Sequence, residues 1–211
     1  MAPSVHPGMT RKINMNKRLI IGVTGPIHSG KSTVSSYLES KGFLHFDADK
    51  IAHDFYLTEE GIHTVEALFG QETIADSKVD INKLRDALKA NPDLKEPLTN
   101  KVWAYVKRKA KNLVDSRPND SIILDVPLLY DSKMYEDCDL VILVLSSQNL
   151  RKTRLLLEGR DADALLKINE NYPLNETKAI ADYIITNDGS KEDLYQQIDA
   201  FLKDKYKCDN H

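Results

Sequence analysis

The segment from Gly25 to Ser32 reads Gly-Pro-Ile-His-Ser-Gly-Lys-Ser and fits the phosphate-binding pattern G-x-x-x-x-G-K-[ST]. In such a loop, backbone N–H groups and the N-terminus of the following helix point at the phosphates of a nucleotide. Lys31 is expected to reach the outer phosphates, and the Ser32 hydroxyl is expected to ligate Mg²⁺. The alternative is a glycine-rich turn with an incidental lysine. The segment therefore predicts a nucleotide-binding protein.

The residues around this loop supply the strand and the helix that the motif requires. A buried strand is predicted over Leu19–Thr24 and a helix over Thr33–Glu39. Helical segments separate four further apolar stretches, Phe43–Phe46, Ile122–Val126, Leu140–Leu145 and Tyr183–Thr186. This alternation predicts an α/β fold, a three-layer sandwich with a five-stranded parallel sheet of the P-loop NTP hydrolase type. Ligands of such sheets bind at the carboxyl ends of the strands.

The stretch between the second and third predicted strands is long and mostly helical. Helices are predicted there over Glu59–Phe69, Ile81–Ala90 and Asp93–Val114. We expect a single domain over residues 18–205, with a core formed by residues 18–56 and 118–205. An inserted helical lobe is expected at about 57–117 and a lid at about 151–172. Residues 1–17 are expected to be a disordered leader.

Aspartates follow two of the predicted strands. Asp47 and Asp49 come after the second strand, and in extended chain such residues, two apart, point the same way. A kinase needs a carboxylate to orient or deprotonate the accepting hydroxyl; Asp49 is the better candidate for this role and Asp47 the better helix cap. Asp125 ends the third strand, where an acid often holds a magnesium-bound water, although it could also belong to a turn before Pro127.

Three arginines lie on or after the helix that follows the fourth strand: Arg151, Arg154 and Arg160. Arginine offers a fixed fork of donors to phosphate, so we expect at least one of them to contact the transferred group. Arg160, beside Gly159 in an expected hinge, is the first candidate and Arg154 the next. For any single one, the alternative is a solvated helix face. His28 is not expected to act as a base, because side chains of such loops usually point away from the phosphates.

The bulk composition excludes several classes of protein. The net charge is -3, which gives no reason to expect nucleic acid or an anionic membrane as a partner. No apolar run approaches the length of a membrane span, and no signal peptide is recognisable. Cys138 and Cys208 do not form a disulfide framework and suggest a reducing compartment, the cytoplasm.

Other motifs in the sequence indicate which class of P-loop protein this is. No N-K-x-D follows a strand and no D-x-x-G occurs, which argues against a GTPase. The small size and the D-x-D after the second strand favour a small-molecule kinase. Two alternatives stay open: a nucleoside monophosphate or other small-molecule kinase, and a non-catalytic ATP-binding protein.

Four blocks of sequence, in a fixed order, resemble one kinase family specifically. They start at Ile21, Phe46, Asp125 and Ala181 and read IGVTG with SGKST, FDADKIAH, DVPLLY and ADYIITNDG. In order and spacing they resemble the dephospho-coenzyme A kinase family from about residue 18 to residue 202. The chain departs from the family at Pro26 and His28, where glycines are usual, and its lid segment is shorter.

The resemblance implies a reaction and a set of site residues. The family phosphorylates the 3′-hydroxyl of dephospho-coenzyme A with ATP and Mg²⁺ in the final step of coenzyme A biosynthesis. It implies Asp49 as the hydroxyl-orienting base, and Asn187 and Gly189 against the adenine. The residues implied to hold ATP and Mg²⁺ are Gly25, Pro26, Ile27, His28, Ser29, Gly30, Lys31, Ser32 and Thr33. Dephospho-coenzyme A is the expected partner of a monomer or weak homo-oligomer.

Overall fold

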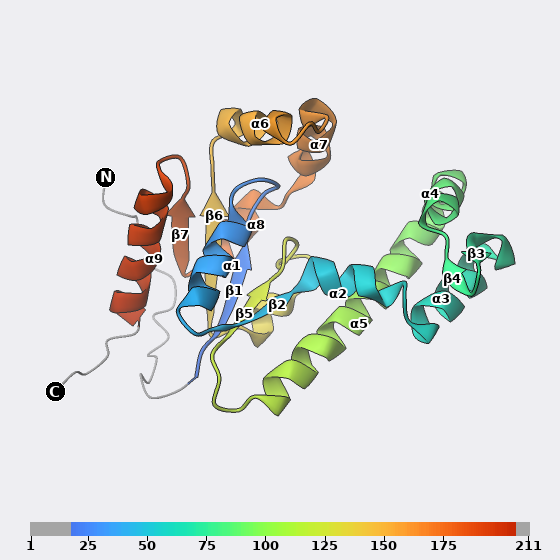
Figure 1. Ribbon diagram of the computed structural model, residues 1–211, viewed down its shortest axis with the longest axis horizontal. Coiled ribbons are helices and arrows are strands. Elements are labelled where there is room, and N and C mark those ends of the chain that lie inside the picture. Colours follow the sequence, from blue (N-terminus) through green and yellow to red (C-terminus); the bar gives the residue numbers. More distant parts are fainter. Residues whose placement is uncertain (1–17, 206–211) are drawn as a thin grey trace. The chain divides into compact units, whose positions relative to one another are not determined.

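The computed structural model describes residues 18–205, apart from the side chains of Ile168 and Lys205. The main sheet has the strand order β2-β5-β1-β6-β7 (Figure 1). Its strands are β1 (Ile20–Thr24), β2 (Leu44–Asp47), β5 (Ile122–Asp125), β6 (Leu140–Leu145) and β7 (Tyr183–Thr186). The predicted five-stranded parallel sheet with flanking helices is confirmed.

Apolar side chains explain why these strands lie inside the molecule. In β6 every residue is apolar and the first five are buried, as expected for a strand with helices on both faces of the sheet. On one face, α1 (Lys31–Ser40) and α9 (Lys191–Lys205) share a core with the sheet that includes Val34, Leu38 and Ile198. The helix α8 (Leu174–Ile180) also contacts the sheet, at β6. Because the strands run parallel, their carboxyl ends lie at one common edge of the sheet, where the loop after β1 begins.

The segment between β6 and β7 contains the residues expected from the sequence to form a lid, an assignment that stays a prediction. It contains α6 (Gln148–Leu157), α7 (Ala162–Ile168), the 3₁₀ turn η4 (Asn169–Asn171) and α8. Gly159 terminates α6, and the hinge expected beside it stays a prediction. Its φ is +68°, its N–H donates to Leu156 O at 3.0 Å, and Arg160 N–H donates to Leu155 O at 3.1 Å. These contacts are the usual glycine ending of a helix.

Residues Asp47–Ser116 form a second compact unit with its own apolar core. Its helices are α2 (Ala48–Phe55), α3 (Glu59–Phe69), α4 (Ile81–Ala90) and α5 (Lys95–Ser116). Pro92 opens the 3₁₀ turn η2 (Pro92–Leu94). The helix predicted over Asp93–Val114 therefore begins in this turn, and α5 itself starts only after it. A short hairpin, β3 (Ile74–Ala75) with β4 (Lys78–Val79), was not predicted. The domain boundaries expected from the sequence stay a prediction.

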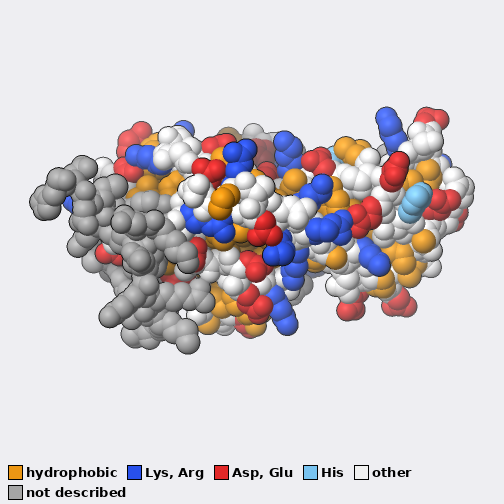
Figure 2. Space-filling view, turned by 90° about the horizontal axis from the view of Figure 1, so that it is seen from below, with side chains coloured by type: hydrophobic (Ala, Val, Ile, Leu, Met, Phe, Trp, Pro, Cys, Tyr) orange, Lys and Arg blue, Asp and Glu red, His pale blue; other side chains and the backbone are white. Residues whose placement is uncertain are grey.

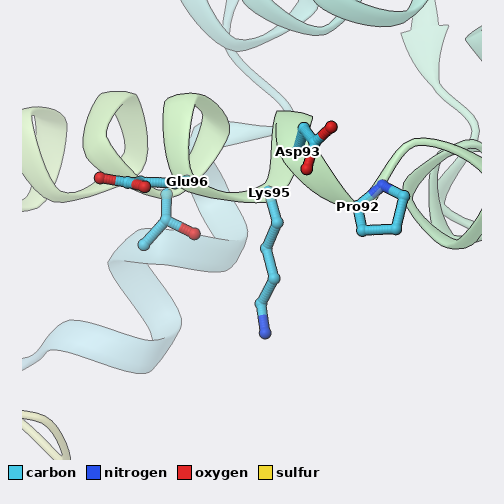
Figure 3. Close-up of a pocket in the computed structure, with 5 residues that line it drawn as sticks. Pro92, Asp93, Lys95 and Glu96 are labelled. Carbon is cyan, nitrogen blue, oxygen red and sulfur yellow. The ribbon is translucent and has the colours of Figure 1, made fainter.

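The surface carries mixed charges. In the view of Figure 2, Lys and Arg side chains lie interspersed with Asp and Glu. An open hollow at the junction of η2 and α5 is lined by exposed residues, among them Pro92, Lys95 and Glu96 (Figure 3), and we assign it no role. Within residues 18–205, none of the helices is long and apolar enough to cross a membrane.

Candidate active site

The loop between β1 and α1 has a backbone that only certain residues allow. Gly25 has φ +153°, and a Cβ there would lie 2.2 Å from the carbonyl oxygen of Val144. Gly30 has φ +100° and is the N-cap of α1. His28 also has a positive φ, +55°, a conformation that histidine adopts more readily than most side chains. A positive φ of this kind would suit glycine at this position, and histidine meets it at moderate cost.

The amide groups at the start of α1 are placed to bind an anion. The first amides of any helix have no intrahelical acceptor, and no side chain caps α1. Two amides of the first turn are already bonded, because Thr33 N–H and Val34 N–H both donate to Gly30 O, at 3.1 and 3.2 Å. The helix dipole adds partial positive charge at the same point. A phosphate group is the ligand that this arrangement suits.

The carbonyl groups of the loop are bound by side chains from elsewhere in the chain. Ser29 O accepts from the amide of Asn187 at 2.8 Å, and His28 O accepts from Arg154 at 3.1 Å. Ile27 O accepts from Arg151 at 3.4 Å. Because these carbonyls accept hydrogen bonds from protein donors, the loop is held in place on its carbonyl side. In contrast, the Ser29 hydroxyl is buried and has no hydrogen-bond partner among residues 18–205.

Arg154 lies against the protein backbone rather than extending into solvent. Besides His28 O, its guanidinium donates to Ser146 Oγ at 3.2 Å and to Asn187 O at 2.9 Å. Arg160, by contrast, is exposed and lies 3.9 Å from Glu158. The phosphate contacts expected of Arg154 and Arg160 stay predictions. The geometry links Arg154 to the loop through its bond to His28 O.

The turn after β7 is anchored to the end of β6. Asn187 N–H donates to Leu145 O at 2.7 Å, and Asp188 Oδ1 accepts from Ser147 N–H at 2.7 Å. Gly189 cannot carry a side chain without moving Asp193, whose Oδ2 lies 2.6 Å from the Cβ position. The adenine contact expected of Asn187 and Gly189 stays a prediction, and Asn187 has a structural role as well.

The pairing expected of Asp47 and Asp49 in an extended segment is wrong, because a helix begins between them. Asp47 ends β2 with an extended backbone, and its carboxylate accepts from Lys50 N–H at 3.0 Å as the N-cap of α2. Asp49 lies in the first turn of that helix and is exposed. The role of Asp47 as a cap is confirmed, and the role of Asp49 as a base stays a prediction.

Asp125 ends β5 beside the first turns of α1. It is 8% exposed, and its Oδ2 accepts from Ser35 Oγ at 2.8 Å. Ser32 lies one turn before Ser35 on the same helix face and is exposed. A hydroxyl and a carboxylate are oxygen ligands of the kind that Mg²⁺ prefers, and Mg²⁺ at phosphates needs few protein ligands. The residues present therefore fit the ion, although the metal assignment of Ser32 and Asp125 stays a prediction.

Comparison with known proteins decides the family. Residues 19–193 match the family model described as dephospho-CoA kinase. The chain belongs to the dephospho-CoA kinase family. A dephospho-CoA kinase from Fusobacterium nucleatum is 33% identical over 188 residues, which cover 88% of this chain and 97% of the relative.

Solved structures agree with this family fold. The structure of TT1252 from Thermus thermophilus has a TM-score of 0.75 at 27% identity and covers 89% of this chain and 98% of its own. A dephospho-CoA kinase from Campylobacter jejuni has a TM-score of 0.66 at 23% identity, covering 89% and 97%. The second likeness supports the fold alone.

Several residues at this kinase-family site carry no signal in the sequence. Asn169 accepts from Ile27 N–H, and the Tyr172 hydroxyl lies 3.2 Å from Thr24 Oγ1. Burial raises the pKa of Tyr172, and burial lowers the pKa of Arg151. No motif contains Asn169 or Tyr172, and only the fold brings them to the loop, whereas Arg151 was singled out by its residue type but not for its contact with Ile27.

Proposed function

We propose that this protein transfers the γ-phosphoryl group of ATP to the 3′-hydroxyl of dephospho-coenzyme A, yielding coenzyme A and ADP. The observation that carries the proposal is the loop from Gly25 to Gly30: the carbonyls of Ile27, His28 and Ser29 accept from protein donors, and the loop leads into the N-terminus of α1, where the helix dipole favours a phosphate. Family membership supports the acceptor.

The loop contributes to transfer by placing positive charge where negative charge develops. The amides at the start of α1 and the ammonium group of Lys31 stabilise the outer phosphates of ATP. Asp49 accepts the proton of the 3′-hydroxyl or holds that hydroxyl in line with the γ-phosphate. Asn187 and Gly189 line the adenine, and Arg160 neutralises charge on the transferred group.

Mg²⁺ would be held by the Ser32 hydroxyl and, through water, by Asp125. When bound, it neutralises charge on the phosphates of ATP. Ser35 keeps the Asp125 carboxylate oriented through its hydrogen bond of 2.8 Å. Orientation of a carboxylate by a neighbouring hydroxyl is a common requirement of such sites.

Two further proposals concern the cellular location and the oligomeric state of the protein. We propose the cytoplasm as its location, in keeping with cysteines that form no disulfide framework. We further propose a monomer or weak homo-oligomer that acts on a free small molecule, without nucleic acid or membrane as partner.

The direct test is ADP production from Mg-ATP by purified protein, with and without dephospho-coenzyme A, followed by mass analysis of the product. The expected result is acceptor-dependent ADP release with coenzyme A as product. Lys31→Ala is the control for contaminating kinases, since it removes the ammonium group from the phosphate loop. Nucleotide binding without turnover of this acceptor would contradict the proposal and favour another hydroxyl acceptor or a non-catalytic role.

A further inference from the structure

Ile27 lies in the middle of the phosphate loop, and residues between β6 and β7 hydrogen-bond both its backbone N–H and its carbonyl. Its N–H donates to Asn169 Oδ1 at 3.0 Å, and its carbonyl accepts from Arg151 at 3.4 Å. The two side chains also bond each other, because Arg151 donates to Asn169 Oδ1 at 3.0 Å. We call Arg151 and Asn169 the Ile27 clasp.

The chemistry of the clasp fixes the orientation of its amide. Both neighbours of Asn169 Oδ1 are N–H groups that can only donate, so the oxygen rather than the nitrogen of the amide must face them. Arg151 has no ion-pair partner at bonding distance among residues 18–205, and its Nε is buried without a hydrogen bond. Partial burial of a cation without a carboxylate costs free energy. Interactions other than an ion pair must therefore stabilise the Arg151 guanidinium in this position.

The clasp belongs to a larger attachment of the lid to the loop. Asn169 opens η4, and Tyr172 follows that turn and reaches Thr24, the residue before Gly25. Thr24 is itself fixed, since its hydroxyl donates to Pro127 O at 2.9 Å. The segment of η4 and Tyr172 thus contacts the end of β1 at Thr24 and the phosphate loop at Ile27, and α6 bonds the loop through Arg151.

We propose that the Ile27 clasp is a positioning device for nucleotide phosphates: it holds the loop in its anion-binding conformation before the nucleotide arrives. This inference rests on the proposed function for its nucleotide but not for its acceptor. A loop that must be ordered on binding loses affinity by the cost of that ordering, so a preset loop binds more tightly. The unpaired charge of Arg151 acts in the same direction, because it adds positive potential beside the loop.

The test compares Asn169→Ala with Glu170→Ala, its exposed neighbour in η4. Two quantities are measured for each: the affinity for MgADP by calorimetry and the hydrogen exchange rate of the Ile27 amide. For Asn169→Ala we expect a dissociation constant about tenfold higher, the scale of one lost hydrogen bond, and faster exchange at Ile27. Glu170→Ala is expected to match the wild type in both.

Kinetics and a conservative variant separate positioning from general damage. The KM for ATP should rise about tenfold in Asn169→Ala while kcat and the KM for dephospho-coenzyme A stay within about twofold. Asn169→Asp keeps the accepting oxygen and should restore slow exchange of the Ile27 amide. It therefore remains informative if the alanine variant does not fold.

Several results would overturn the clasp. One is unchanged Ile27 exchange in Asn169→Ala; another is faster exchange with MgADP affinity within about twofold of the wild type. Fast exchange in Asn169→Asp as well would show that the accepting oxygen does not hold the loop. Failure of the proposed function is distinguishable, because it appears as no turnover of dephospho-coenzyme A by the wild type while MgADP binding still reports on the clasp.

Discussion

The side chain of Asn187 donates to the carbonyl of Ser29 across 2.8 Å, and it fits there only because the next residue, Gly30, has no Cβ. A Cβ on Gly30 would lie 2.0 Å from Asn187 Nδ2. The second glycine of the motif is therefore required by a contact with a residue far along the chain as well as by its φ of +100°.

Gly30→Ala should displace Asn187, release the Ser29 carbonyl and raise the dissociation constant for MgADP at least about tenfold. The matched control is Gly42→Ala, where φ is +98° but nothing lies within 4 Å of the Cβ position. Both variants carry the backbone strain, so both should lower the melting temperature. Calorimetry with MgADP separates them, and equal affinities in the two variants would contradict the role of Asn187.

Arg154→Lys tests whether this arginine holds the loop or contacts the transferred phosphoryl group. A lysine has all its N–H donors on one nitrogen, whereas Arg154 reaches His28 O and Asn187 O from the two separate nitrogens of its guanidinium, so lysine cannot bond both in the same way. If Arg154 holds the loop, the KM for ATP should rise about tenfold with kcat little changed. A large fall in kcat with an unchanged KM would instead support phosphoryl contact. Lys152→Ala, at an exposed position on the same helix, is the control.

Asp49→Asn tests the proposed base. The amide cannot accept the hydroxyl proton, so kcat should fall by roughly 10²-fold or more, the usual scale for a general base, while ATP affinity is largely retained. Asp54→Asn makes the same chemical change in the same helix and should leave kcat near the wild-type value. Loss of ATP binding with retained turnover would exclude Asp49 as the base.

Asp131 should make stability depend on pH in an identifiable direction. Burial raises the pKa of its carboxyl group, and the charge of Glu176 raises it further. The unfolded chain then ionises first, so stability falls as pH rises from the ordinary value of about 3.9 through the raised pKa. Asp131→Asn removes this loss and should raise the melting temperature at pH 7 but not at about pH 3. An increase at acidic pH alone would contradict the assignment.

The sequence is sufficient to predict the main sheet because each strand is an apolar run with polar residues at its ends. The hairpin of β3 and β4 was missed because its strands have two residues each, and its turn places Asp76 and Ser77 at positive φ without a glycine. The extended D-x-D reading failed because capping by Asp47 starts a helix at Ala48.

The site was predictable only as far as local motifs reach. The loop itself follows from eight contiguous residues. Asn169 lies 142 positions from the amide that it accepts from, and nothing in its neighbourhood marks it. Arg154 was expected to contact phosphate from its residue type, but its bonds to backbone carbonyls depend on how α6 packs.

The partners of the loop carbonyls also constrain when the protein can first bind a nucleotide. The motif is synthesised early, yet Arg151, Arg154 and Asn187 emerge from the ribosome more than a hundred residues later. Until then the carbonyls of Ile27, His28 and Ser29 lack these side-chain donors, so less holds the loop in its folded shape. We therefore expect nucleotide affinity to be acquired late, after β7 has joined the sheet, and ATP binding to chains truncated before and after β7 would test this.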